Sequence, residues 1–351
     1  MSSAMPRTAT VLDSSAPNLS DDEVSQILQE VYGIEGRISL LTSERDRNYH
    51  IHARDGRDVL LKVTNAAEPR EITRFQTDAL LEIARADPSL PVPRIVPTLG
   101  GEAEHVARLP GQGESVVRLL TYLHGEPLHR TERSPAQRHN IARCLARLDI
   151  ALAHAAAPTI PHELQWDIRN APKLRPMMDA LTDPAQHAAA EAVLDTFEQH
   201  VAPVLQSLRR QVIHNDFNPH NILVAPDDPT RVTGILDFGD MVFTPLVIDV
   251  ATACAYQVAA ADHPLHTVGE FIAAYHGANP LTREEFTVIF PLIQARLVTT
   301  LIITNWRARR YPANRTYILR NTGPSLAALE QIGRIGRAEA EDYFLRICDM
   351  R

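Results

Sequence analysis

Apolar and polar positions follow two different patterns along this chain, and the pattern changes near residue 124. Before that point, apolar residues mostly alternate with polar ones, which is typical of strands with one buried face. The segment 68–86 is the exception, because its apolar residues recur every three or four positions and predict a helix. The predicted strands of this first part are 37–41, 48–54, 58–64 and 116–122.

The start of the chain carries two further signals. Residues 1–19 are rich in Ser, Ala, Thr and Pro, and they predict a disordered, loosely attached tail. Ser20 and Glu23 then form the spacing of a capping box, which predicts a helix that runs to about Tyr32 and stops at Gly33. The first lobe is therefore expected to span residues 20–123.

After residue 124 the apolar spacing becomes mostly helical. The segment 124–127, His-Gly-Glu-Pro, predicts a hinge between this part and the first lobe. We therefore expect an α+β protein with a small lobe built on a mixed, mainly antiparallel sheet, and a larger, mainly helical lobe over 124–351. The helices predicted for the second lobe are 135–155, 173–183, 184–209, 247–261, 265–277, 281–310 and 324–346.

Two short polar blocks interrupt the helical pattern and carry the candidate chemistry. The first reads H-x-D-x-x-x-x-N and contains Asp216 and Asn221, and the second is D-F-G and begins at Asp237. Phosphoryl transfer needs a base that orients a hydroxyl and oxygen ligands that hold Mg²⁺ beside the phosphates. We assign Asp216 as the base, and Asn221 and Asp237 as metal ligands.

The alternative without function is that these are ordinary turn residues, since Asp, Asn and Pro favour turns. Both blocks in this order, each beside a strand-like apolar run, favour the kinase interpretation. A zinc site at His214 and His220 is disfavoured, because no second pair of Cys or His ligands stands at suitable spacing. His214 is expected to be a structural residue that packs and hydrogen-bonds within its loop.

A kinase also needs a cation for the nucleotide. Lys62 is the charged residue in the apolar strand 59–63, and its ammonium is expected to hold the α- and β-phosphates of ATP or GTP. The alternative is a lysine whose stem lies along a half-exposed strand with its charge in water. The downstream blocks favour the functional role.

These motifs resemble the aminoglycoside phosphotransferase-like family of small-molecule kinases, which share the two-lobed protein-kinase-like fold. The phrases that carry the resemblance are 214–224, 235–241 and 304–308, and the resemblance covers about 20–350. It is closest to the branch of hydroxylysine kinases and the amino-alcohol kinase domains fused to class III aminotransferases.

The resemblance implies positions around the nucleotide. A glutamate on the following helix would pair with Lys62, but the equivalent position holds Gln76, with Glu71 one turn earlier as the alternative. The phosphate-covering loop would be 42–48, which contains no Gly, with Ser43 and Asn48 as phosphate-binding residues. Thr121 and Leu123 would lie against the adenine or guanine of the nucleotide.

The resemblance also implies residues of the acceptor lobe. Asp249, an acid within an apolar helical run, would support the catalytic loop by hydrogen bonding. Asp240 would line the acceptor pocket. Trp306 and Arg307 end a long apolar helix, where basic residues suit the helix dipole alone; the sharper hypothesis is that Trp306 walls the pocket and Arg307 binds a substrate carboxylate.

Composition limits the class of protein. The 351 residues are 44% hydrophobic and carry a net charge of −8. The composition therefore lacks the excess of basic residues that is typical of proteins that bind nucleic acid. Three widely spaced cysteines predict free thiols in a reducing compartment, and we expect a cytoplasmic protein. No uninterrupted apolar stretch of transmembrane length and no signal peptide is recognised, so no membrane partner is expected, and the protein is expected to be a monomer or homodimer.

The sequence thus predicts transfer of the γ-phosphoryl group from ATP or GTP, with Mg²⁺, to a hydroxyl of a small amino-bearing metabolite. A hydroxylysine-like amino acid or an amino alcohol is the leading acceptor, and an aminoglycoside or homoserine is the alternative. A protein kinase is disfavoured, because no A-P-E segment follows Asp237. An inactive nucleotide-binding module is disfavoured, because Lys62, Asp216, Asn221 and Asp237 are all present.

Overall fold

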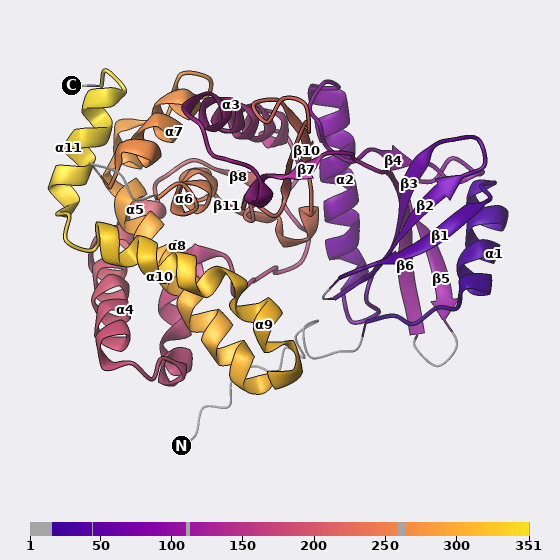
Figure 1. Ribbon diagram of the computed structural model, residues 1–351, viewed down its shortest axis with the longest axis horizontal. Helices are drawn as coiled ribbons and strands as arrows, with labels where there is room; N and C mark the ends of the chain where they lie inside the picture. The colour runs from indigo at the N-terminus through magenta and orange to yellow at the C-terminus, as the bar shows by residue number, and fades with distance from the viewer. Residues whose placement is uncertain (1–15, 44, 110–112, 259–263, 351) are drawn as a thin grey trace. The chain divides into compact units, whose positions relative to one another are not determined.

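The structure is a computed structural model that describes residues 16–43, 45–109, 113–258 and 264–350. The chain divides into two compact units (Figure 1). Unit 1 comprises Met1–His124 with Pro158–Pro161, and unit 2 comprises Gly125–Ala157 with His162–Arg351. Each unit is considered by itself.

Unit 1 is built on an antiparallel sheet of six strands. Its order is β1-β2-β3-β6-β4, and β5 pairs with the other part of β6. This sheet has the antiparallel pairing predicted for the small lobe. The strands are β1 Gly36–Leu41, β2 Arg47–Ala53, β3 Asp58–Val63, β4 Ile95–Val96, β5 His105–Leu109 and β6 Gly113–Thr121, and the helices are α1 Asp21–Tyr32 and α2 Arg70–Ala86.

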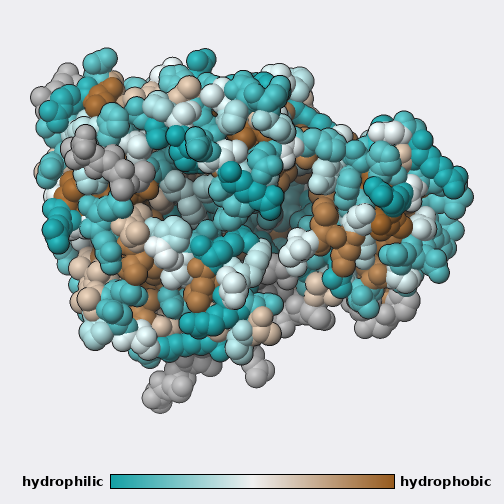
Figure 2. All heavy atoms as spheres, in the orientation of Figure 1, coloured by the Kyte–Doolittle hydropathy of each residue, from teal (hydrophilic) through white to brown (hydrophobic). Residues whose placement is uncertain are grey.

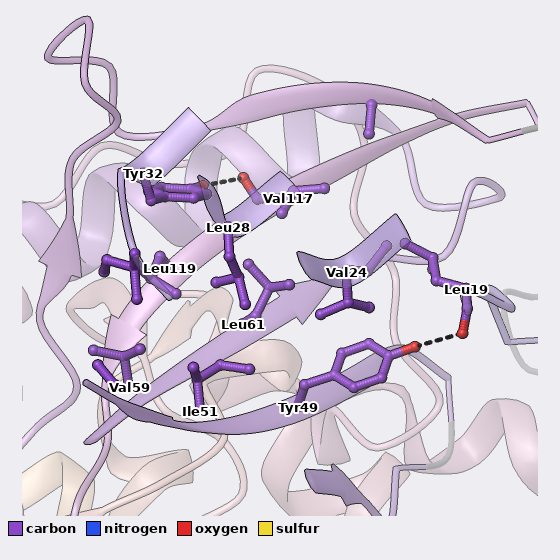
Figure 3. Close-up of a cluster of buried hydrophobic side chains, with 14 of the residues drawn as sticks. Leu19, Val24, Leu28, Tyr32, Tyr49, Ile51, Val59, Leu61, Val117 and Leu119 are labelled. Atoms are coloured by element: carbon purple, nitrogen blue, oxygen red, sulfur yellow. Dashed lines mark hydrogen bonds between the residues drawn. The ribbon is translucent and has the colours of Figure 1, made fainter. Parts of the chain in front are cut away.

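The two faces of this sheet have different roles. Alternate residues of β3, such as Val59 and Leu61, are buried in an apolar core against α1 (Figure 3). The helix begins with the predicted capping box at Ser20 and ends at Gly33, whose φ of 65° is left-handed. Because successive strand residues point to opposite faces, Lys62 lies on the face away from this core.

The segment before α1 is attached more firmly than predicted. Leu19 is part of the core, and its carbonyl accepts the hydroxyl of Tyr49 at 3.4 Å. The Nε of Arg47 also donates to the carbonyl of Pro17 at 2.8 Å. The prediction of a loose tail is therefore wrong for these residues, because Leu19 extends the apolar face of α1. Residues 1–15 lie outside the described residues.

Unit 2 is mainly helical, with short strands at the predicted polar blocks. The three-stranded sheet has the order β10-β9-β7, and β11 pairs with β8. The strands are β7 Glu126–Pro127, β8 Arg210–Ile213, β9 Ile222–Val224, β10 Val232–Ile235 and β11 Val242–Pro245. The main α-helices are α3 Pro135–Leu152, α4 Pro184–Thr196, α5 Ala202–Leu205, α6 Val247–Ala255, α7 His266–His276, α8 Arg283–Arg310, α9 Arg315–Ile318, α10 Thr322–Ile332 and α11 Arg337–Ile347.

Several helices of unit 2 differ from prediction at their ends. The predicted helix 173–183 overlaps a 3₁₀ segment, η3 Ile168–Ala180, whose two prolines remove the donors that an α-helix needs. The predicted helix 184–209 is α4 and α5 joined by a π-turn at Phe197–Val201. The predicted helix 324–346 is divided into α10 and α11 after Gly333. The helix predicted over 247–261 ends at Ala255.

Helix α8 is the central helix of unit 2, and it contacts η3, α4, α6, α10 and α11 (Figure 1). By length and composition it is apolar enough to span a membrane, although Arg296 interrupts its apolar run. Its most apolar window is, however, 89% buried inside the protein, as in the core helix of a globular fold. Hydrophilic residues cover most of the face in Figure 2, and apolar ones gather there only in small groups.

Candidate active site

The loop after β8 carries the first polar block, and α6 fixes its start. The backbone turns at Asn215, whose φ of 64° is left-handed, a conformation that Asn tolerates better than most residues. Its Nδ2 donates to the carbonyl oxygen of Asp240 at 3.1 Å. The buried carboxylate of Asp249 accepts the backbone N–H groups of His214 and Asn215 at 3.0 and 2.8 Å. Asp249 therefore makes the hydrogen bonds to the loop that were expected of it.

Asp216 lies between a side chain of its own loop and a side chain of α8. Its Oδ2 accepts the Nδ2 of Asn221 at 2.7 Å, and its Oδ1 accepts the Nη2 of Arg296 at 3.1 Å. Burial raises the pKa of Asp216 to about 6, with Arg296 opposing the rise and the charges of Asp240 and Asp237 adding to it. The side chain is 21% exposed, so a ligand can reach it. This position and pKa suit a general base at neutral pH.

The oxygen atoms expected to hold a divalent cation come from Asn221 and Asp237. The amide nitrogen of Asn221 donates to Asp216, which leaves its amide oxygen as the ligand atom. Asp237 follows β10 with a left-handed φ of 58°, and its exposed carboxylate accepts the N–H of Gly239 at 3.2 Å. The charges of Asp237 and Asp240 both act on Asp216. Hard oxygen donors among crowded carboxylates fit a cation such as Mg²⁺.

His214 joins the two polar blocks. Its Nε2 lies 2.9 Å from the carbonyl oxygen of Leu236, the residue before Asp237, and its Nδ1 accepts the N–H of Asp216 at 3.2 Å. The N–H of Leu236 in turn donates to the carbonyl of Asn221 at 2.7 Å. Because Nδ1 accepts, the proton is on Nε2 and the ring is neutral. With both ring nitrogens of His214 engaged, this residue does not serve as a zinc ligand.

His220 is also engaged elsewhere. Its Nε2 lies 3.2 Å from the Oδ1 of Asn321, and its ring lies against that of His129 with the ring centres 4.1 Å apart. Burial, together with the positive charge of Arg320, lowers the pKa of His220 to about 4. These contacts give both histidines of the block a structural place in unit 2.

A buried pair of acids lies behind the loop, and sequence analysis did not predict it. Asp149 of α3 and Asp249 of α6 are both fully buried and hydrogen-bonded to each other. Burial and the neighbouring charge of Asp249 raise the pKa of Asp149 well above its ordinary value, so Asp149 is protonated and donates to Asp249. The hydroxyl of Tyr275 donates to Asp149 at 2.6 Å, and the Nδ2 of Asn279 donates to Tyr275 at 3.0 Å.

Arg296 contacts Asp216, and sequence analysis missed it. It is 2% exposed, and beside its contact with Asp216 it donates to the carbonyl of Trp166 at 3.2 Å and to the hydroxyl of Tyr256 at 3.3 Å. Its guanidinium carbon lies 5.2 and 5.9 Å from the ring centres of these two residues. The available signal was that Arg296 is the one charged residue between Glu285 and Arg307 in an apolar run.

The predicted pair at the end of α8 lies elsewhere. Arg307 follows Arg296 by eleven residues, which is about 16 Å along a helix. Arg307 is buried, and Arg310 lies over the ring of Trp306 at 5.2 Å. The structure therefore brings Arg296, and not Arg307, into contact with Asp216.

In unit 1 the ammonium of Lys62 pairs with the loop between β1 and β2. Its Nζ lies 2.6 Å from the Oδ2 of Asp46, and both side chains are 16% exposed. The Oδ1 of Asp46 accepts the N–H of Asn65 at 3.0 Å. Burial opposes ionisation of Asp46, but Lys62 and Asn65 hold its pKa below the ordinary value. The loop is thus fastened to the cation expected to hold the phosphates.

The pairing predicted for Lys62, with Gln76 or Glu71, stays a prediction. Gln76 accepts the Nη2 of Arg118 at 3.1 Å, and Glu71 is exposed in the first turn of α2. Arg118 is the cross-strand neighbour of Lys62 in the β3–β6 register and is 2% exposed. Sequence analysis did not identify Arg118, whose guanidinium binds the side-chain amide of Gln76.

The other predicted nucleotide residues also lie in unit 1. Asn48 is the cross-strand neighbour of Lys62 on β2, and Ser43 lies in the preceding loop, partly buried. The backbone N–H of Thr121 donates to the carbonyl of Arg94 at 2.9 Å, and the hydroxyl of Thr121 accepts the N–H of Arg94 at 2.9 Å. Leu123 follows β6 and is partly buried. Of these, Asn48 is placed next to Lys62 on the neighbouring strand by the register.

Comparison with known proteins identifies the family. The model of the phosphotransferase enzyme family matches residues 37–287, well over half of the chain. The chain is 26% identical to hydroxylysine kinase of Danio rerio over 339 residues, covering 93% of this chain and 95% of that protein. It is 31% identical to homoserine kinase of Methylobacillus glycogenes over 264 residues, covering 74% of each.

Solved structures of small-molecule kinases share the fold. A microcompartment-associated aminopropanol kinase aligns with a TM-score of 0.67 at 18% identity, covering 93% of this chain and 98% of that one. An amicoumacin kinase in complex with AMP-PNP and Ca²⁺ aligns with a TM-score of 0.65 at 14% identity, covering 92% and 94%. The predicted kinase-like fold class is confirmed. The chain belongs to the phosphotransferase enzyme family and is a small-molecule kinase.

Proposed function

We propose that this kinase transfers the γ-phosphoryl group of ATP or GTP to a hydroxyl of a small amino-bearing metabolite, with a hydroxylysine-like amino acid as the leading acceptor. The observation that carries the proposal is the position of Asp216, partly exposed and held between Asn221 and Arg296. The likeness to hydroxylysine kinase over nearly the whole chain supports the acceptor class.

Asp216 acts on the acceptor. Its carboxylate accepts a hydrogen bond from the acceptor hydroxyl and orients the oxygen toward the γ-phosphorus. The new bond forms between that oxygen and phosphorus, the bond from phosphorus to the bridging oxygen breaks, and the nucleoside diphosphate leaves. The hydroxyl proton passes to Asp216, whose pKa of about 6 lets the carboxylate be ionised at neutral pH.

The other residues hold the nucleotide and its counter-ion. Asn221 and Asp237 would hold Mg²⁺, which neutralises phosphate charge when bound. Lys62 binds the α- and β-phosphates through its ammonium. Ser43 and Asn48 contact the phosphates as further hydrogen-bonding groups. Thr121 and Leu123 contact the adenine or guanine of the nucleotide.

A second acceptor, homoserine, deserves equal testing because the homoserine kinase relative is 31% identical over 74% of the chain. Hydroxylysine and homoserine are both hydroxylated amino acids, but hydroxylysine has a longer side chain that ends in a second amino group. Amino alcohols and aminoglycosides are the alternatives without a carboxylate. We further propose a cytoplasmic location, which suits three free cysteines in a reducing compartment.

The test is a nucleoside-diphosphate release assay with purified protein. ATP and GTP are each combined with 5-hydroxylysine, homoserine, 1-amino-2-propanol and an aminoglycoside, in the presence of Mg²⁺. We expect the highest kcat/KM with a hydroxylated amino acid, and its loss in Asp216→Asn. A preference for the aminoglycoside, or full activity of Asp216→Asn, would reject the proposal.

A further inference from the structure

We propose that Arg296 is the subsite for the acceptor's carboxylate, which restricts this kinase to zwitterionic hydroxy amino acids over the corresponding amines. The inference rests on the proposed function and specifies the acceptor class of the same site. It replaces Arg307, about 16 Å further along α8, as the residue expected to contact a carboxylate.

The first step of the argument is the place of the guanidinium. Arg296 is 2% exposed, yet its Nη2 lies 3.1 Å from Asp216, whose side chain is 21% exposed. A group bound at this guanidinium is therefore a neighbour of a group bound at the base. Trp166 and Tyr256, which border the guanidinium, are partly exposed themselves. A ligand at Asp216 thus has a cation beside it, bordered by two aromatic rings.

The second step is the supply of donors. Arginine has five N–H donors. The contacts of Arg296 within the described residues are to Asp216, the carbonyl of Trp166 and the hydroxyl of Tyr256, and its buried Nε has no partner there. A buried donor without a partner is unfavourable. A ligand carboxylate is the planar acceptor that matches adjacent guanidinium N–H groups in two parallel hydrogen bonds.

The third step is the distribution of charge around the base. Two charges of opposite sign act on Asp216: the positive charge of Arg296 and the negative charge of Asp240. An acceptor whose only charges are ammonium groups is repelled by Arg296. An amino acid offers a carboxylate to Arg296 and an ammonium to Asp240, with its hydroxyl toward Asp216. The site thus has charges of both signs, as a zwitterion requires.

The alternative is that Arg296 only positions Asp216. The two roles differ in what a substitution does to different acceptors. Loss of positioning lowers kcat for every acceptor by the same factor, because the base is shared. Loss of a carboxylate subsite lowers kcat/KM only for acceptors that carry the carboxylate. The ratio of kcat/KM between matched acceptors therefore separates them.

The experiment compares 5-hydroxylysine with the diamine that lacks its carboxylate, and homoserine with 3-amino-1-propanol. In the unmodified enzyme we expect the amino acid of the productive pair to be favoured by about 10²-fold or more in kcat/KM. Arg296→Gln should reduce this preference to within about threefold of unity, and Arg296→Lys should retain part of it. An unchanged preference in Arg296→Gln overturns the subsite.

Arg209→Gln is the matched control. It breaks another arginine–carboxylate pair, between Arg209 just before β8 and Glu285 of α8 at 2.7 Å, and should leave the acceptor preference unchanged. The substrate side gives an independent test if Arg296 variants do not fold. The carboxamide of the same hydroxy amino acid, given to the unmodified enzyme, should lose most of the preference; an equal kcat/KM for carboxylate and carboxamide overturns the subsite.

The outcomes also separate this inference from the proposed function. Turnover of the amines at the same kcat/KM as the amino acids leaves the kinase assignment intact and rejects the role of Arg296. Turnover of an aminoglycoside alone, with none for either matched pair, rejects the proposed acceptor class and the carboxylate subsite together.

Discussion

The Nε2 of His214 lies 2.9 Å from the carbonyl oxygen of Leu236. One neutral imidazole therefore connects the loop that carries Asp216 to the end of the strand that precedes Asp237. The same ring accepts the N–H of Asp216 through Nδ1. This buried side chain and the backbone hydrogen bond from Leu236 to Asn221 therefore hold the two polar blocks together without a ligand. This contact makes His214 part of the geometry of both Asp216 and Asp237.

We expect His214→Leu to destabilise unit 2 by about 2–3 kcal/mol, because it leaves the Leu236 carbonyl and the Asp216 N–H without their buried partner. Turnover should fall by roughly 10- to 100-fold through misplacement of the base. Urea unfolding and steady-state kinetics measure the two effects. A variant of full kcat would mean that the loop keeps its geometry without the ring.

Asp149→Asn should change how stability depends on pH. The pKa of Asp149 is raised in the folded protein, so its contribution is fully present below the unfolded value of about 3.9 and is lost as pH rises toward the folded value. Asparagine donates to Asp249 and accepts from Tyr275 without taking up a proton.

Urea unfolding at several pH values tests this prediction. Between about pH 5 and pH 8, the unmodified protein should lose more stability with rising pH than Asp149→Asn does, because only it must hold a proton at Asp149. Parallel pH profiles of the two proteins would mean that Asp149 is ionised in the folded state.

Asp216 should set the acid limb of activity. Burial raises its pKa to about 6, and the carboxylate form is the one that accepts a proton, so kcat/KM should fall by about tenfold per unit as pH drops below that value. Asp216→Asn should lower kcat by roughly 10²- to 10⁴-fold while nucleotide binding survives. An acid limb unmoved from the pKa of a free aspartate would contradict this assignment.

Asp46→Asn should tighten nucleotide binding by up to about tenfold. The Asp46 carboxylate lies 2.6 Å from the ammonium of Lys62, so bound phosphates would share this cation with it, and the substitution removes that competing charge. Titration calorimetry with nucleotide and Mg²⁺ measures the affinity. Asp55→Asn, in the exposed hairpin turn, is the control. Weaker binding in Asp46→Asn would instead show that Asp46 organises the loop for the phosphates.

Asp237→Ala should abolish the dependence of nucleotide affinity on Mg²⁺, because it removes the carboxylate expected to hold the cation. The affinity without Mg²⁺ should change little. Asp227→Ala, an exposed acid 80% accessible between β9 and β10, is the control and should keep the Mg²⁺ effect. Calorimetry with and without the metal compares the three proteins, and a preserved Mg²⁺ effect in Asp237→Ala would move the metal elsewhere.

Local patterns predicted much of the fold. Alternation placed β1, β2 and β3 to within one residue at each end, because a single buried face imposes a period of two. It began β6 three residues late and did not predict β4 and β5. Helical spacing failed at η3, where Pro172 and Pro176 override it. It also merged α10 with α11, because a spacing pattern does not register a break between two helices that bury similar faces.

The candidate site divides in the same way. The base, its asparagine and the aspartate of the second block were found because they stand at fixed spacing within short segments. Arg296 was not, since it reaches Asp216 across 80 residues of chain. Asp46 was not recognised as the partner of Lys62, because the expected partner lay on a helix and the observed one lies on a loop. Such pairings are decided by tertiary packing.

The carboxylate of Asp249 has a consequence for exchange kinetics. It holds the amide protons of His214 and Asn215 in a site closed to solvent, so they exchange with deuterium only when α6 separates from the loop. Their exchange rate therefore measures how often the catalytic loop opens. It can be measured in the enzyme without substrates, before any acceptor is known.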